Sequence, residues 1–337
     1  MRQVTRFAAY GAAALALAVS TAAEAKMKRI TIGSNRQGSV FYLLSSSFAK
    51  QLQQQLKVRT TAQPHAGSTV YMAVVNKGEM TLGLNNSMDS GAAVRGGAPF
   101  KKKLKHIRAI AMVWTIPYGF MVKANSGIKT VADLKGKTVV TTTGPIVSLS
   151  NLNIAYLHSG GLSVKDIRGI KSGGIVDNIT KVVEGRADAA AMSPGMPAVR
   201  KAHATVPGGM RFLPLGAGGS DAFLAREVPG AKSKGLKPSK RMPFLSETTR
   251  VAAFDAYLNA GKQVSSGDAY KIIKVLHTRW KTMQKSVGPL RPLHMNKIAP
   301  PTNPHPYHPG VVKYLKEKGL WSAANEKQQK AVLAEIR

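Results

Sequence analysis

One structural pattern is written twice in this chain. A short apolar run around Ile30 leads into a loop of small and polar residues at 33–39, then a helical stripe, a second helix start at Gly67 and a second apolar run that ends at Ser87. The same order recurs between residues 139 and 193. Strand, small-residue loop and helix N-terminus together form a βα unit, whose loop lies at the C-terminal end of the strand. The repeat therefore predicts two similar α/β lobes that face each other across a cleft.

The first 25 residues have the pattern of a cleavable signal peptide. A basic start with Arg2 and Arg6 precedes an apolar stretch from 7 to 19, and Ala23-Glu24-Ala25 has the A-x-A form of a signal-peptidase site. The apolar stretch is short for a membrane anchor. We therefore expect residues 1–25 to be removed and the mature protein to be exported.

Composition excludes some chemistry and raises a question about charge. The chain has no Cys, so it can form neither disulfides nor thiolate metal sites. Its 49 Lys and Arg against 16 Asp and Glu give a net charge of +33, a balance typical of nucleic-acid-binding proteins. The basic residues are scattered, however, apart from a cluster at 101–105, and no zinc-finger or RNA-binding motif accompanies them. We interpret the charge as a solvated cationic surface and expect no specific nucleic-acid binding.

Hydrophobic periodicity outlines the rest of the chain. Apolar residues at three- and four-residue spacing predict a helix from Val40 to Leu56, and two separate strands are predicted at 107–113 and 118–122. Residues 216–243 show no clear period and are interpreted as a long loop, and 250–258 as a strand that returns to the first lobe.

These crossings of the chain predict its domain organisation. A chain that leaves lobe I near Lys123 and returns near Arg250 makes that lobe discontinuous, and the two crossings form a hinge. The predicted organisation is a signal peptide at 1–25, the first part of lobe I at 26–123, lobe II at 124–249, and the return segment with C-terminal helices at 250–337.

Several segments together resemble the TAXI family, the extracytoplasmic solute receptors of tripartite ATP-independent periplasmic (TRAP) transporters. The matching segments are Ile30-Thr31-Ile32-Gly33, Gln37 to Tyr42, Gly67-Ser68, Gly78-Glu79 with Leu82-Gly83, residues 125–137, His305 to Gly310, and Tyr314 to Trp321. The loop with Asn35-Arg36 and the strand end Asn85-Asn86-Ser87 depart from the family pattern.

The resemblance implies a type II periplasmic-binding-protein fold, with two α/β lobes joined by a hinge around a ligand cleft. It also implies that the protein delivers a small solute to a TRAP-type integral membrane permease. The solute is often an organic anion such as glutamate or another carboxylate. The resemblance implies binding without catalysis, cofactor or metal. We expect a monomer in the periplasm.

Candidate ligand contacts are the small and polar residues of the loops that face the predicted cleft, because a buried anion needs directed N–H and O–H donors. In the first half they are Ser34, Asn35, Arg36, Ser39, Tyr42, Gly67, Ser68, Asn85, Asn86 and Ser87. In the second half they are Thr142, Thr143, Ser148, Gly173, Gly174 and Ser193. Each of three candidates also has a structural interpretation. Ser68 could cap a helix, and Tyr42 could lie in the core. Arg36 could clamp a carboxylate with its guanidinium or could be a solvated loop charge, and the second is slightly favoured.

Other functions stay open at this point. His305 and His308 lack the further His or acidic neighbours of a metal site, so a structural role is favoured. No Ser-His-Asp order, catalytic carboxylate pair or phosphate-binding motif stands out. A periplasmic ligand sensor with a signalling partner would use the same fold, and a cationic surface protein that binds polyanions would use the same charge.

Overall fold

The computed structural model describes residues 27–144 and 146–336, so the predicted signal peptide and Pro145 lie outside the described residues. The predicted repeat is confirmed as two successive βαβαβα units. The first copy comprises β1 (Arg29–Asn35), α1 (Val40–Leu56), β2 (Arg59–His65), α2 (Ser68–Lys77), β3 (Leu82–Asn86) and α3 (Ser87–Arg95). The second copy comprises β5 (Thr138–Thr143), α4 (Val147–Ser159), β6 (Arg168–Ser172), α5 (Ile175–Val183), β7 (Ala189–Met192) and α6 (Pro197–Thr205).

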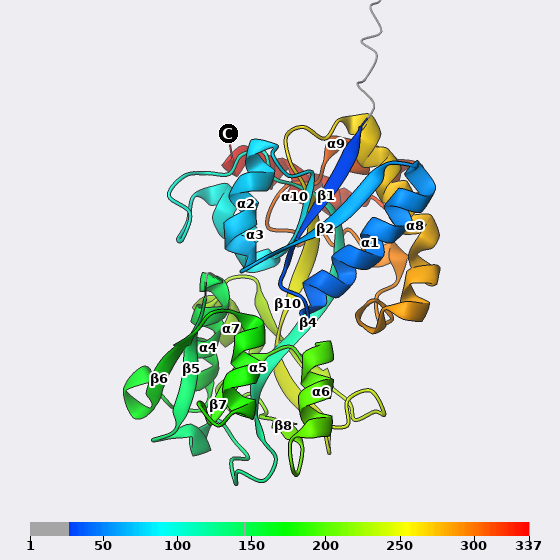
Figure 1. Ribbon diagram of the computed structural model, residues 1–337. Helices are drawn as coiled ribbons and strands as arrows, with labels where there is room; N and C mark the ends of the chain where they lie inside the picture. Colours follow the sequence, from blue (N-terminus) through cyan, green and yellow to red (C-terminus); the bar gives the residue numbers. More distant parts are fainter. Residues whose placement is uncertain (1–26, 145, 337) are drawn as a thin grey trace, which may run out of the picture.

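The strand order is the same in both copies. The path through the sheet is β2-β1-β3-β10-β4-β7-β5-β6, so each copy places its first strand between its second and third. Within each copy the paired strands are parallel, and the third strand borders a long antiparallel strand, which is β10 (Thr249–Ala260) in one case and β4 (Arg108–Lys123) in the other. The two copies therefore meet end to end through β4 and β10, which run from the upper to the lower part of the molecule in Figure 1.

β4 is a single strand of 16 residues, so the prediction of two separate strands at 107–113 and 118–122 was wrong. Its first part pairs with β10 as far as Tyr118, and its last part pairs with β7 and β8 (Met210–Phe212) from Gly119 onward. Pro117 stands just before this change of partner, so it breaks the sequence pattern without ending the strand. The lobe boundaries at 123/124 and 249/250 stay predictions.

The first helix forms for reasons visible in its sequence. The hydroxyl of Ser39 accepts a hydrogen bond from the backbone N–H of Tyr42 (3.2 Å) and caps the helix, and Lys57 ends it in the left-handed conformation (φ 56°). Its apolar stripe packs on β1 and on α8 (Ser266–Ser286), where the rings of Phe48 and Trp280 stack with centroids 6.4 Å apart. The C-terminal helices α8, α9 (Pro309–Glu317) and α10 (Ala323–Glu335) thus lie beside the first copy (Figure 1).

The segment 216–243 is less irregular than its sequence predicted. It contains α7 (Asp221–Glu227) and β9 (Ala231–Leu236), and β9 pairs antiparallel with β10. Short 3₁₀ turns occur at Ala132–Leu134, Val164–Asp166, Gly288–Leu290 and Met295–Lys297. Within residues 27–144 and 146–336, no helix combines the length and the apolar character that crossing a bilayer requires.

Candidate functional site

A cavity lies where the two copies meet the crossing strands, and we call it the chamber. It holds about 450 Å³ of empty space, its opening to solvent included. Trp114, Ile116 and Tyr118 line it from β4. Their spacing of two residues puts all three on one face of the strand. Phe254 lies on β10, where it pairs with Ile116 of β4, and it completes this floor. The ring centroids of Phe254 and Tyr118 lie 5.9 Å apart.

The walls of the chamber come from helix starts of both copies. Besides the floor, apolar side chains at or next to the first residues of α1, α4, α5 and α6 line the chamber. These wall residues are Val40, Phe41, Ile146, Leu149, Ile175 and Met196. The polar residues that line it are Asn35, Ser39, Ser68, Asn86 and Ser193, and none of the described lining residues carries a charge. The chamber is thus an apolar space with a few hydrogen-bonding groups.

The polar groups of the chamber differ in their hydrogen bonding. Asn35 ends β1 and is 8 % exposed, and its buried Oδ1 has no hydrogen-bond partner. The hydroxyl of Ser193 accepts from the backbone N–H of Gly195 (3.3 Å), and that of Ser39 accepts from its helix, so both retain a proton to donate. The hydroxyl of Ser68 instead donates to Asp89 (2.7 Å). The N-cap of α2 is Gly67 and not Ser68, which corrects the capping role considered for that serine.

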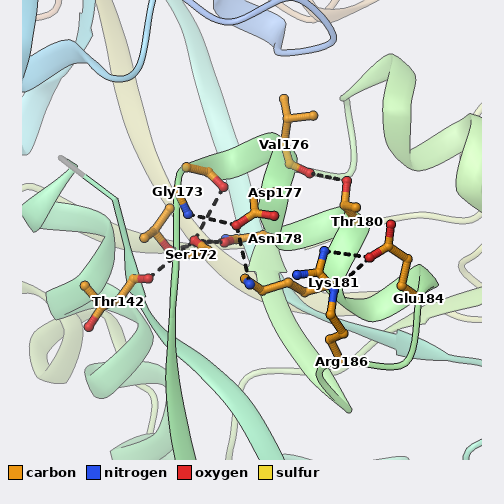
Figure 2. A network of polar contacts seen from close by, with 12 residues as sticks. Thr142, Ser172, Gly173, Val176, Asp177, Asn178, Thr180, Lys181, Glu184 and Arg186 are labelled. Atoms are coloured by element: carbon orange, nitrogen blue, oxygen red, sulfur yellow. Dashed lines mark hydrogen bonds and ion pairs between the residues drawn. The ribbon is translucent and has the colours of Figure 1, made fainter.

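A second, more polar hollow adjoins the chamber, since Asn35 and Ile175 line both, and we call it the mouth. Arg36 and Gln37 line it on the first copy, and Gly173, Gly174 and Asp177 on the second. Arg36 is exposed. Figure 2 shows the opposite side, where Asp177 accepts from the backbone N–H of Gly173 (2.8 Å) and lies 3.7 Å from the ammonium of Lys181. Among the residues that line the mouth, Arg36 therefore supplies an exposed positive charge next to the chamber.

The buried carboxylate of Asp89 lies behind the chamber wall, and nothing in its local sequence marks it as part of a site. Asp89 accepts hydrogen bonds from the hydroxyl of Ser68 and from the amide of Asn86 (2.9 Å), and its backbone N–H donates to Asn86 Oδ1 (2.7 Å). The hydroxyl and N–H of Ser148, on α4, are further partners. Burial raises the pKa of Asp89, and these hydrogen bonds, which lower the pKa, offset part of that effect.

The structure brings eight of the sixteen predicted residues to the site. Asn35, Ser39, Ser68, Asn86 and Ser193 line the chamber, and Arg36, Gly173 and Gly174 line the mouth. The other eight, Ser34, Tyr42, Gly67, Asn85, Ser87, Thr142, Thr143 and Ser148, line neither. Their contact with a ligand stays a prediction, and their side chains have other surroundings.

Most of those eight bond to the protein itself. In the first copy, the Ser34 hydroxyl donates to backbone carbonyls, and Tyr42 OH accepts from Gln37 (3.2 Å). The Asn85 amide bonds Ser90 and Asn259. Gly67 has extended backbone (φ −176°).

In the second copy, the Thr143 hydroxyl accepts from Asn153 and Asn178 (both 3.2 Å). The Thr142 carbonyl accepts from Ser172 (3.3 Å), a contact that Figure 2 includes. Ser87 and Ser148 line a separate hollow together with Asp89.

The aromatic floor is what sequence reasoning missed. The signal was present, because Trp114, Ile116 and Tyr118 alternate with less apolar residues. Pro117 interrupts this alternation, because proline is rare inside strands. Gly195 belongs to the same arrangement, since a Cβ there would lie 3.2 Å from the Trp114 ring.

The two histidines of the proline-rich tail are held by protein groups. His305 Nε2 lies 2.5 Å from Asn259 Oδ1, and His308 bonds the carbonyl of Val264 (3.0 Å) and the N–H of Gly310 (3.3 Å). These contacts fit the structural role that was favoured. Across the described ranges, no three His, Asp or Glu side chains gather as a metal site requires.

Comparisons with known proteins agree on the family and the fold. Residues 32–319 match the NMT1-like family. The structure is similar to that of MatC from Rhodopseudomonas palustris with bound malate, with a TM-score of 0.52 at 15 % identity over 90 % of this chain and 99 % of that one. It is also similar to PhnD1 from Prochlorococcus marinus in complex with methylphosphonate, with a TM-score of 0.51 at 15 % identity over 77 % of this chain and 88 % of that one.

The mixed α/β architecture and these similarities confirm the predicted type II periplasmic-binding-protein fold. The match spans most of the sequence, so the chain belongs to the NMT1-like family.

Proposed function

We propose that this protein is an extracytoplasmic solute receptor that captures a small organic anion between its two lobes and delivers it to a TRAP-type membrane permease. The observation that carries the proposal is the chamber itself, because both copies and both crossing strands line it. A ligand there touches both sides of the cleft at once. Such a ligand favours the closed arrangement over the open one in proportion to its extra contacts.

The proposal requires no chemistry on the solute. Asn35, Ser39 and Ser193 offer hydrogen bonds, and the exposed guanidinium of Arg36 at the mouth offers a charge for an acidic group. Two proteins of the same fold hold small anions, malate and methylphosphonate, which is in keeping with this function. The TRAP-type partner rests on the resemblance to the TAXI family over residues 28–322, and export to the periplasm on the predicted signal peptide.

A screen of small solutes tests the receptor function. The mature protein, purified without unfolding, is examined by native mass spectrometry for a retained small molecule and then by thermal shift against carboxylates, amino acids, phosphonates and sulfonates. At least one solute should bind at a one-to-one ratio and raise the melting temperature, because binding to the native state stabilises it. Failure of every class contradicts the function.

The partner is tested separately. Pull-down from detergent-solubilised inner membranes should recover a TRAP permease with the liganded receptor. Recovery of a sensor kinase instead identifies a ligand sensor. Binding to heparin or DNA that weakens steeply with salt, without any small ligand, identifies a polyanion-binding protein.

A further inference from the structure

The chamber offers hydroxyl donors but no positive charge to pair with a buried anion. No Lys, Arg or His is among its described lining residues, and an unpaired anion in an apolar space is costly. Two residues whose donors would serve an anion are already engaged, because the hydroxyl of Ser68 and the amide of Asn86 both donate to Asp89. On that side of the chamber the donors of Ser68 and Asn86 hold a buried carboxylate and are not free to bind an anion.

The chamber instead suits an apolar group. Its floor is the aromatic face of Trp114, Tyr118 and Phe254, and aliphatic side chains from both copies complete it. Flat rings and branched chains gain most from such surroundings. The unpartnered Oδ1 of Asn35, at the boundary with the mouth, would accept from an uncharged N–H or O–H of the solute.

The mouth carries the charge that the chamber lacks. Arg36 lines it and is exposed, whereas Asp177 on the opposite side is engaged by Gly173 and Lys181. Asn35 and Ile175 line both spaces, so one solute can occupy both. We infer that the solute is a hydrophobic monocarboxylate, with an aromatic or branched aliphatic body in the chamber and its single acidic group beside Arg36.

This inference rests on the proposed receptor function and narrows its substrate class. Five probes separate its parts by isothermal titration calorimetry and thermal shift. They are 3-phenylpropionate and 4-methylpentanoate as apolar monoacids, glutarate and glutamate as acids with further charge, and 3-phenylpropanamide as an uncharged analogue. The apolar monoacids should bind at least tenfold more tightly than glutarate or glutamate. The amide should bind more weakly than 3-phenylpropionate.

Two pairs of variants locate the bound probe. Arg36→Gln should lower the affinity for 3-phenylpropionate at least tenfold and leave the affinity for 3-phenylpropanamide unchanged. Arg59→Gln, which removes an exposed charge on β2, should change neither affinity. Binding should alter tryptophan fluorescence in the wild type and in Trp321→Phe but not in Trp114→Phe, because only Trp114 of the three tryptophans lines the chamber.

The outcomes distinguish this inference from the function on which it rests. Tighter binding of glutarate or glutamate than of 3-phenylpropionate overturns the inference and leaves a receptor for charged solutes. Binding of a phosphonate or sulfonate alone does the same. An unchanged affinity of Arg36→Gln for 3-phenylpropionate also overturns it, since the acid would then lie elsewhere. Failure of all solutes in the wider screen removes the receptor function as well.

Discussion

The side-chain amide of Asn86 donates a hydrogen bond to the hydroxyl of Ser148, 3.2 Å away. Asn86 caps α3 in the first copy, and Ser148 lies in the first turn of α4 in the second copy, so this bond joins the two copies across the cleft. Asp89 takes part in the same joint, because it accepts from both residues. The contact between the copies is thus polar and buried beside a chamber that is mostly apolar.

Replacing Ser148 tests this joint. Ser148→Ala removes a donor from the buried carboxylate of Asp89 and the partner of the Asn86 amide, so we expect the free energy of unfolding to fall by about 1–3 kcal/mol. Asn151→Ala, an exposed position on the same helix, should stay within about 0.5 kcal/mol of the wild type. Urea denaturation measures both. An equal loss in the two variants would mean that the interlobe bond contributes nothing.

The buried carboxylate predicts a particular pH dependence. Burial raises the pKa of Asp89 in the folded protein above its value in the unfolded chain. The folded state then binds the proton more tightly, so the carboxyl lowers the free energy of unfolding as pH rises from about 4 through the raised pKa. Asp89→Asn lacks this titration. Its stability relative to the wild type should therefore be lowest at acidic pH and improve toward neutral pH.

Denaturation at several pH values from 4 to 7 checks this expectation for Asp89. Glu79→Gln, which removes an exposed carboxylate whose side chain is 62 % accessible, is the control and should not reproduce the trend. If the difference in unfolding free energy between the wild type and Asp89→Asn stayed constant from pH 4 to 7, the carboxyl would titrate alike in the folded and unfolded states.

The sequence allowed the repeat to be predicted because its signals are local. The serine that caps α1 and the glycine that ends α2 each lie within one short window of sequence, and a glycine also ends α4 in the second copy. Pairing partners are not local. Trp114 and Phe254 are far apart in sequence, and only the register of β4 on β10 places both beneath one chamber.

Asp89 could not be identified for a similar reason. An acidic residue in the first turn of a helix is typical of a solvent-exposed helix start, where it complements the helix dipole. Its burial follows from α2 and α4, which approach from other parts of the chain and supply Ser68 and Ser148. The polar loop ends were predictable as residue types, but which of them face the chamber depends on this packing.

The buried His305 predicts a second pH effect with the opposite sign. Burial lowers the pKa of His305 to about 3, and the charges of Arg108 and Arg95 act in the same direction. The folded state keeps the ring neutral, so its contribution to stability is full above the unfolded pKa of about 6.5 and is lost as pH falls toward 3. The expected slope is up to about 1.4 kcal/mol per pH unit in that window.

A variant with no titrating ring checks the His305 effect. His305→Gln keeps a donor for Asn259 and should flatten the fall in unfolding free energy between pH 6.5 and 4.5. His294→Gln, at an exposed site, should keep the wild-type slope. The explanation fails if both variants lose stability with falling pH as steeply as the wild type does.

The close approach of two loops at the mouth predicts the effect of a single methyl group at Gly144. Gly144 has a φ of +46°, and a Cβ there would lie 2.9 Å from the backbone C and O of Gly173. Gly136 has a φ of +72° with nothing within 4 Å of its Cβ position, so Gly136→Ala isolates the conformational strain, about 1–2 kcal/mol. Gly144→Ala adds the backbone clash and should lose more.

Solute binding separates the Gly144 and Gly136 variants further. Gly173 and Gly174 line the mouth, so displacing them in Gly144→Ala should weaken the best solute of the screen, whereas Gly136→Ala should bind it normally. Chemical denaturation and calorimetry on the same preparations measure stability and affinity. Equal stability losses with unchanged affinity in both variants would mean that the loop yields to the methyl group, and that the mouth does not depend on the packing of Gly144 against Gly173.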